Sequence, residues 1–318
     1  MVHYLLIINF LSLLTVRAFI SNPLLLSAPI QSALGSSRRT FFSGVVVVGE
    51  CIALSGGEPA FAINDQASSS KLPTGLLESR LESNVLEPPP YGMESSDIFY
   101  PSWFAGNWKV ASETKRVEAP CGVPLFGGNA TFNNAQNDIG NVLKYECRFL
   151  NDDQSRVIAD REFNVKSIVK VSMGENSIVD ISVATPNKFS CILAPKGSPS
   201  LLSVDLIVLN RRSEKEEEDP NNFYCSEVVR EIATIVGEQR QQQKRPSVLK
   251  EIETTSKYTY LPERDEVHCI QRSASFLLPS DQNEMAMRMW QLSRGRAIDV
   301  RFYDVVYTRP LKVTLDTI

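Results

Sequence analysis

The sequence predicts an all-β fold, an antiparallel up-and-down β-barrel of about eight to ten strands with one or two short helices. Three observations lead to this prediction. About nine segments alternate apolar and polar residues with the period of two that marks a half-buried strand. Polar loops, several with Pro or Gly, separate these segments, and helical periodicity is sparse. Closing such a sheet removes the unpaired edges that an open sheet exposes.

The strand pattern is clearest in VLKYECRFL, where Leu143, Tyr145 and Cys147 alternate with charged residues. All the expected strands together cover residues 108–117, 142–150, 177–185, 188–195, 201–212, 222–232, 248–261, 266–278 and 297–309.

Two helices are expected between these strands. A short one begins near Asn164, and a longer one follows Ser280 or Asp281 and ends at Gly295. The loop 119–132, rich in Pro and Gly, is expected to form either a lid over a barrel opening or an Ω-loop on the surface.

The first 62 residues are expected to be a targeting leader. Residues 1–18 have the short apolar run of a signal peptide, which stops at Arg17-Ala18-Phe19. Residues 20–40 contain serine and arginine but no acidic residue, which is typical of a plastid transit peptide. The Ala-Phe junction resembles the signal-peptide boundary of proteins imported into the complex plastids of algae such as diatoms.

The rest of the leader, within residues 19–62, indicates export into the thylakoid lumen. Arg38 and Arg39 precede a moderately apolar stretch, and Ala60 and Ala62 provide the small residues that a signal peptidase recognises. The alternative is a basic region that contains two arginines by chance, and Glu50 inside the apolar stretch departs from the twin-arginine pattern. The expected location is therefore the thylakoid lumen of a chloroplast.

Beyond the leader, residues 63–96 are expected to form a flexible N-terminal segment and residues 97–318 the barrel domain. No apolar run reaches the roughly 18–20 residues that a membrane-spanning helix needs. The net charge of −4 disfavours nucleic acid as a partner, since phosphate binding needs clustered Lys and Arg.

Few residues offer catalytic or metal-binding chemistry. His268 is the only histidine beyond the leader, and no CxxC pair or nucleophile motif is present, so neither a metal site nor a cofactor is expected. Two alternatives stay open for the cysteines: all are buried thiols, or at least one disulfide forms. The five cysteines are at positions 121, 147, 191, 225 and 269.

The polar segment from Asp160 to Asn164 is the candidate site. Asp160 and Glu162 are expected to share one face of a strand, with Arg161 beside them. Two interpretations stay open. In the functional one, these residues orient a polar ligand at the barrel mouth or perform acid–base chemistry there. In the structural one, they cap the following helix and form an ion pair.

Gly106-Asn107-Trp108 opens the first confident strand and resembles the Gly-x-Trp signature of lipocalin-like barrels. That resemblance implies that Trp108 closes the barrel floor beneath a basic side chain of the last strand. Arg301 and Arg309 are the candidates for this side chain, through a cation–π contact.

Three longer segments carry a wider resemblance: YPSWFAGNWKVASETKRVEAPCGVPLFGG, VIADREFNVKSI and RFYDVVYTR. Together they are similar to a cyanobacterial and plastid lipocalin-like domain family of unknown function, over residues 99–309. Cys121 in the Ala-Pro loop and a charged insertion at 211–222 depart from that pattern. The resemblance implies a thylakoid-associated protein with no assigned reaction.

We therefore expect a non-enzymatic lumenal barrel protein. It either binds a small apolar ligand (a pigment, a quinone or a lipid) or assists the assembly or maintenance of a photosynthetic complex. The alternative is a lipocalin-type enzyme that uses carboxylates on a carotenoid or lipid. That reaction requires two acids that converge inside the barrel.

Overall fold

The computed structural model describes residues 75–195, 200–216, 218–236, 247–279 and 284–310. The expected leader, with Arg38, Arg39, Ala60 and Ala62, lies outside these residues. So does the expected helix cap at Ser280 or Asp281.

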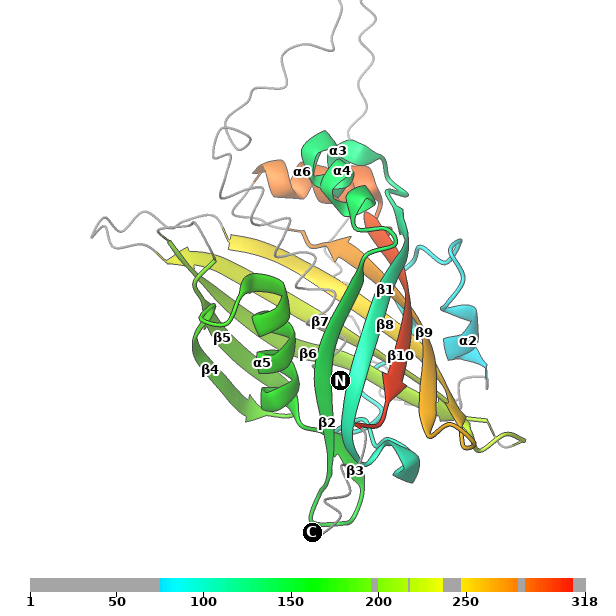
Figure 1. Cartoon of the computed structure of the whole chain (residues 1–318). Helices are drawn as coiled ribbons and strands as arrows, with labels where there is room; N and C mark the ends of the chain where they lie inside the picture. Colours follow the sequence, from blue (N-terminus) through cyan, green and yellow to red (C-terminus); the bar gives the residue numbers. More distant parts are fainter. Residues whose placement is uncertain (1–74, 196–199, 217, 237–246, 280–283, 311–318) are drawn as a thin grey trace, which may run out of the picture. The chain divides into compact units, whose positions relative to one another are not determined.

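The prediction of an antiparallel all-β fold with few helices is confirmed (Figure 1). One ten-stranded sheet curls into a half-barrel, in the order β3-β2-β1-β10-β9-β8-β7-β6-β5-β4. Nine strands fall on the expected segments, and the three-residue β3 was not expected, because so short a strand shows no periodicity. The strands are β1 (Gly106–Glu118), β2 (Val142–Asn151), β3 (Val157–Ala159), β4 (Ile178–Thr185), β5 (Lys188–Leu193), β6 (Leu201–Lys215), β7 (Asn222–Val236), β8 (Ser247–Leu261), β9 (Glu266–Leu277) and β10 (Asp299–Thr308).

Most neighbouring strands are consecutive in the sequence, as in an up-and-down barrel, but the sheet is open between β3 and β4 and not between the first and last strands. Strands β4 to β10 pair in succession, and the last strand, β10, then pairs with β1. The break lies between β3 and β4, and we call it the seam. The chain between these two strands forms the longest described helix, α5 (Arg161–Met173), which takes the place of a direct strand pairing.

Two features cover the seam. Helix α5 packs against both β2 and β4, and Val165, Ile168 and Val169 bury its apolar side in the sheet's core. Residues 93–100, which we call the crossing segment, also connect strands on the two sides of the seam. Met93 forms a parallel bridge with Arg211 of β6, and Tyr100 forms an antiparallel bridge with Val157 of β3.

The remaining helices are short. They are α2 (Leu76–Ser79), the 3₁₀ turn η2 (Ser102–Phe104), α3 (Val123–Phe126), α4 (Asn129–Asn137) and α6 (Glu284–Ser293). The loop expected as a lid or Ω-loop forms α3 and the start of α4, at the end of the sheet where α6 also lies (Figure 1). Within the described residues, no helix has the length and apolar character to cross a bilayer.

Residues 75–96 belong to the segment that we expected to be a flexible tether, and the structure packs them onto the outer face of the sheet instead. Leu77 is fully buried, and Arg80 forms an ion pair with Glu253 of β8. Tyr91 donates to Ser226 of β7 at 2.5 Å. This second layer explains why the middle of β7, β8 and β9 is buried on both faces.

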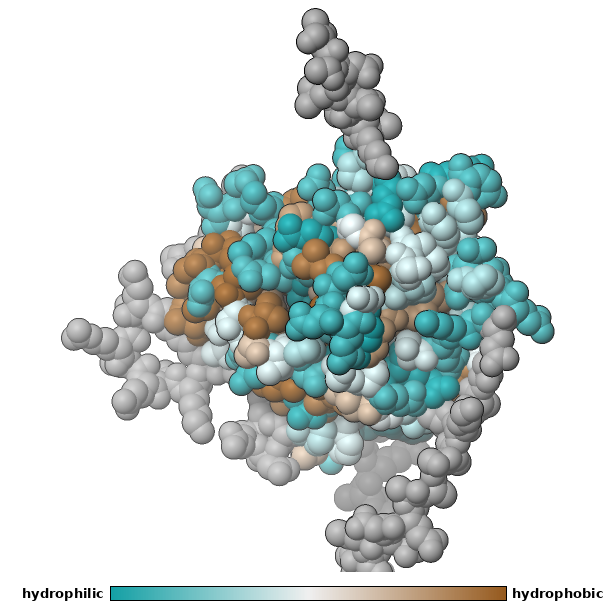
Figure 2. Space-filling model, turned by 90° about the horizontal axis from the view of Figure 1, so that it is seen from below, coloured by the Kyte–Doolittle hydropathy of each residue, from teal (hydrophilic) through white to brown (hydrophobic). Residues whose placement is uncertain are grey.

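The main core lies on the concave face, where alternate residues of the curled sheet meet α5 and residues 98–104. Seen from below, hydrophobic side chains gather on the side that carries α5, β4 and β5, and hydrophilic ones dominate elsewhere (Figure 2). The edge strand β4 contributes to this, since Val179 is 56% exposed.

Candidate binding site

Aromatic side chains close one end of the concave face, and we call Phe104, Trp108, Tyr307 and Arg309 the floor. Trp108 is fully buried, and its indole nitrogen donates to the carbonyl of Phe104 at 2.7 Å. The rings of Phe104 and Tyr307 meet edge to face at 5.7 Å between centroids, a favourable aromatic geometry.

Arg309 is the basic side chain that covers Trp108. Its guanidinium carbon lies 3.7 Å from the centre of the indole ring. Its two terminal nitrogens donate to the carbonyls of Ala105 and Trp103 at 2.7 and 2.9 Å. The floor therefore combines a cation–π contact with satisfied hydrogen bonds.

Gly106 makes this approach possible. Its φ of +107° is a conformation that L side chains rarely adopt, and a Cβ at this position would lie 2.8 Å from Nη1 of Arg309. Arg301, the other candidate, lies elsewhere. It forms a two-point ion pair with Asp299 and sits 5.6 Å from the ring of Phe126 in α3.

The segment from Asp160 to Asn164 is helical rather than a strand, which corrects our expectation. Asp160 caps α5 by accepting from the backbone nitrogen of Phe163, and it pairs with Arg148 of β2 at 2.6 Å. Asn164 is fully buried and bonds both backbone groups of Arg148. Glu162 is exposed and pairs with Lys166 one turn later. These residues fasten α5 to β2, and the two acids do not converge.

Arg161 belongs to a buried ionic cluster at the seam. It pairs with Asp97 of the crossing segment, and Arg211 of β6 pairs with Glu227 of β7. All four side chains are at most 7% exposed. Burial raises the pKa of Glu227, while the neighbouring guanidiniums of Arg211 and Arg161 oppose that rise. The cluster places two acids and two bases beside the seam.

Above the floor, the concave face becomes polar, as the strand register shows. One row of cross-strand neighbours runs Thr114, Tyr303, Gln271, Ser256 and Cys225 from β1 to β7. The next runs Arg301, Ser273, Thr254, Glu227 and Arg211 from β10 to β6. Directly opposite residues share a face of the sheet, so these rows form one surface, which we call the polar wall.

Several polar atoms of the wall are buried with no hydrogen-bond partner in the protein. They include both amide atoms of Gln271, the hydroxyl oxygen of Thr254 and Oε2 of Glu227. Gln271 is 0% and Thr254 is 4% exposed. Buried polar groups in native proteins are nearly always bonded, to protein, water or ligand. The wall therefore carries buried hydrogen-bonding groups that the protein itself does not satisfy.

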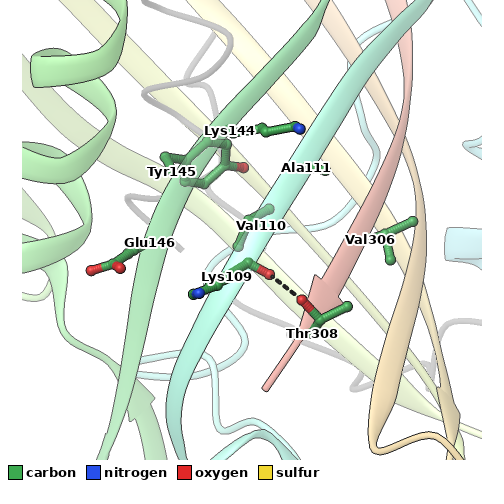
Figure 3. A pocket seen from close by; sticks show the side chains of 8 residues that line it. All are labelled: Lys109, Val110, Ala111, Lys144, Tyr145, Glu146, Val306 and Thr308. Atoms are coloured by element: carbon green, nitrogen blue, oxygen red, sulfur yellow. Dashed lines mark hydrogen bonds between the residues drawn. The ribbon is translucent and has the colours of Figure 1, made fainter. Parts of the chain in front are cut away.

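A shallow groove lies on the opposite, outer face of β2, β1 and β10 (Figure 3). It has a volume of about 410 Å³, and its lining includes Lys109, Lys144, Ala111, Val306 and Thr308. Both lysines are exposed. His268 also lies outside, on β9 opposite Val306, and pairs with Glu266.

No disulfide joins the cysteines among the described residues. Cys147, Cys191, Cys225 and Cys269 are buried, and burial raises the pKa of each thiol, to about 12 for Cys191 and Cys225. They serve as small apolar residues. Among the described residues, no three His, Cys, Asp or Glu side chains are grouped as a metal site.

The chain belongs to a family defined by a domain of unknown function, DUF6816, whose model matches residues 92–302. That range covers more than half of the 318 residues. It contains the crossing segment, the seam and the whole polar wall. No curated protein and no solved structure matches the chain significantly.

The polar wall is not evident from the sequence patterns described above. Its signal is present in β8, where Thr254 and Ser256 alternate in phase with the core residues Ile252 and Tyr258. An inward face that changes from apolar to hydroxyl-bearing side chains and back marks such a surface. Because both faces of this stretch are polar, the change on the inward face does not stand out in the sequence.

Proposed function

We propose that this chain is a non-enzymatic barrel-like protein of the thylakoid lumen that holds a small molecule on its concave face. The observation that carries the proposal is the polar wall, with its buried and unpartnered groups at Gln271, Thr254 and Glu227. The class of ligand we favour is a pigment, quinone or lipid, an apolar molecule with a polar end. The floor closes the face at one end with packed aromatic rings.

The arrangement of the acids supports binding rather than catalysis. The carboxylates expected to act together, Asp160 and Glu162, serve one as a helix cap and the other as an exposed ion-pair partner. Glu227 and Asp97 are each held by an arginine within the seam cluster. An enzyme of the lipocalin type needs a pair of acids free to exchange protons with a substrate.

The location rests on the leader, with Arg38 and Arg39 and the Ala60-Phe61-Ala62 junction. N-terminal sequencing of the protein from its source should find a start near Ile63. A protein that retains residues upstream of Arg38 would contradict lumenal delivery. Changing Arg38 and Arg39 to lysine should block import into isolated thylakoids, and unimpaired import would exclude the twin-arginine route.

The binding role is tested on protein purified from thylakoids under mild conditions. We expect organic solvent to extract about one pigment, quinone or lipid per chain. An empty protein that co-purifies with a photosynthetic complex would contradict this role and favour assembly or maintenance of that complex. Turnover of an added carotenoid or lipid would contradict the non-enzymatic assignment.

A further inference from the structure

The charged side chains of the polar wall are already neutralised by protein partners. Arg301 donates to both oxygens of Asp299, at 2.9 and 2.8 Å. Arg211 pairs with Glu227, and both are at most 2% exposed. An ionised ligand group would have to leave water without a counter-ion on this surface, which is costly.

Apart from Oε2 of Glu227, whose charge is balanced by Arg211, the wall's unsatisfied groups are uncharged. The amide of Gln271 offers two N–H donors and a carbonyl acceptor, and Thr254 offers a hydroxyl that both donates and accepts. These two side chains lie diagonally across β8 and β9, because Thr254 is opposite Ser273 and Gln271 is opposite Ser256. Diagonal neighbours are about 7–8 Å apart, within reach of one small polar group.

The next row toward the floor is apolar. Phe223, Tyr258, Cys269 and Val305 are neighbours across β7, β8, β9 and β10 on the same face, and each is at most 2% exposed. A molecule on the wall therefore meets hydrogen-bonding groups on one side and hydrocarbon and aromatic surface on the other.

We propose that the polar wall binds the uncharged, oxygen-bearing end of an amphipathic molecule, through carbonyl or hydroxyl oxygens that bond Gln271 and Thr254. This inference rests on the proposed binding function and adds the chemical class of the ligand. It excludes carboxylate, phosphate and ammonium groups as the end that meets the wall.

Three probes with the same alkyl tail test this class in calorimetric titrations of the folded chain. They are 2-decyl-1,4-benzoquinone, which is uncharged, decanoate, which is an anion, and decyltrimethylammonium, which is a cation. We expect the quinone to bind at least about tenfold more tightly than either ion, since one lost hydrogen bond to a buried group has about this effect. An ion that binds as tightly as the quinone would overturn the proposal.

Two wall variants and one control locate the binding. Gln271→Leu and Thr254→Val should each weaken quinone binding about tenfold, while Gln154→Leu in the exposed β2–β3 turn should leave it unchanged. A cooperative melting transition at or above the wild-type temperature shows that the variants fold. Full-strength quinone binding by both folded wall variants would overturn the proposal.

These experiments also distinguish failure of the proposed ligand class from failure of the proposed binding function. Ion binding that depends on Gln271 would leave the binding function standing and overturn only the ligand class. If no probe binds and the protein from thylakoids carries no small molecule, both fail.

Discussion

The floor and the polar wall lie on the same concave face, yet they are built in opposite ways. In the floor, the indole nitrogen of Trp108 and the terminal nitrogens of Arg309 all have acceptors, and aromatic rings fill the space between them. In the wall, the amide nitrogen of fully buried Gln271 has no acceptor and its amide oxygen has no donor. A satisfied region contributes to stability, whereas buried polar groups without partners cost stability. The floor therefore stabilises the fold, whereas the wall carries the unsatisfied groups on which our binding proposal rests.

The largest expected effect is at the centre of the floor. Trp108→Ala removes a fully buried indole with its aromatic contacts, so the free energy of unfolding should fall by about 3–5 kcal/mol. Urea denaturation followed by circular dichroism measures this change. A loss under about 1 kcal/mol would mean that Trp108 does not hold the floor.

A smaller effect is expected at Arg309, a partly exposed side chain that covers the buried ring of Trp108. Arg309→Ala loses a cation–π contact and two hydrogen bonds to backbone carbonyls, so we expect a loss of about 1–2 kcal/mol in the same assay. Arg264→Ala, at an exposed position in the β8–β9 turn, is the control and should change stability by less than about 0.5 kcal/mol. Equal effects of the two variants would show that the guanidinium contributes nothing specific.

A substitution in the polar wall should not lower the free energy of unfolding as substitutions in the floor do. Gln271→Leu replaces an unpartnered buried amide with a side chain of similar size, so in ligand-free protein it should leave stability unchanged or raise it by about 1 kcal/mol. Thermal unfolding of the ligand-free chain measures this. A loss of 2 kcal/mol or more would show that the amide is part of a stabilising network, and the contrast with the floor would then disappear.

The smallest expected effect is a pH dependence from the seam. Burial raises the pKa of Glu227, so the folded chain keeps this proton to a higher pH than the unfolded chain does. Below about 4.3, the usual pKa of a glutamate, both states are protonated and the residue contributes no slope. As pH rises above that value, the unfolded chain releases the proton first, so the Glu227 contribution lowers stability.

The Glu227→Gln variant isolates this slope. Subtracting its free energy of unfolding from that of the wild type at each pH should give a difference that falls as pH rises from about 4.3. A difference that rises with pH would mean that Arg211 lowers the pKa of Glu227 more than burial raises it.

The sequence predicts the class of fold because apolar and polar residues alternate wherever one face of a strand is exposed to solvent, as in β2. It fails where a second layer covers the sheet. Arg80, Tyr91 and the rest of residues 75–96 bury the outer face of β7 to β9, and composition alone made this segment look like a tether. The seam is equally invisible to periodicity, since it depends on a three-residue strand and on isolated bridges.

The candidate site was only partly predictable, for a related reason. Gly106 and Trp108 are close in sequence, and the basic partner came from two named arginines, of which Arg309 lies over the ring. The polar wall instead joins residues from six strands, and only the register brings Arg211 and Arg301 into one row. The segment from Asp160 to Asn164 attracted attention for its charges, which serve to fix a helix.

The most direct test of the central claim observes Gln271 itself. In a ¹⁵N-labelled chain, the side-chain amide signal of Gln271 is identified by its absence from the Gln271→Leu variant. The account predicts that this signal shifts, in proportion to occupancy, when 2-decyl-1,4-benzoquinone is titrated into the protein. A Gln271 signal that stays fixed while signals around Lys109 and Lys144 shift would contradict it, and would place binding in the outer groove.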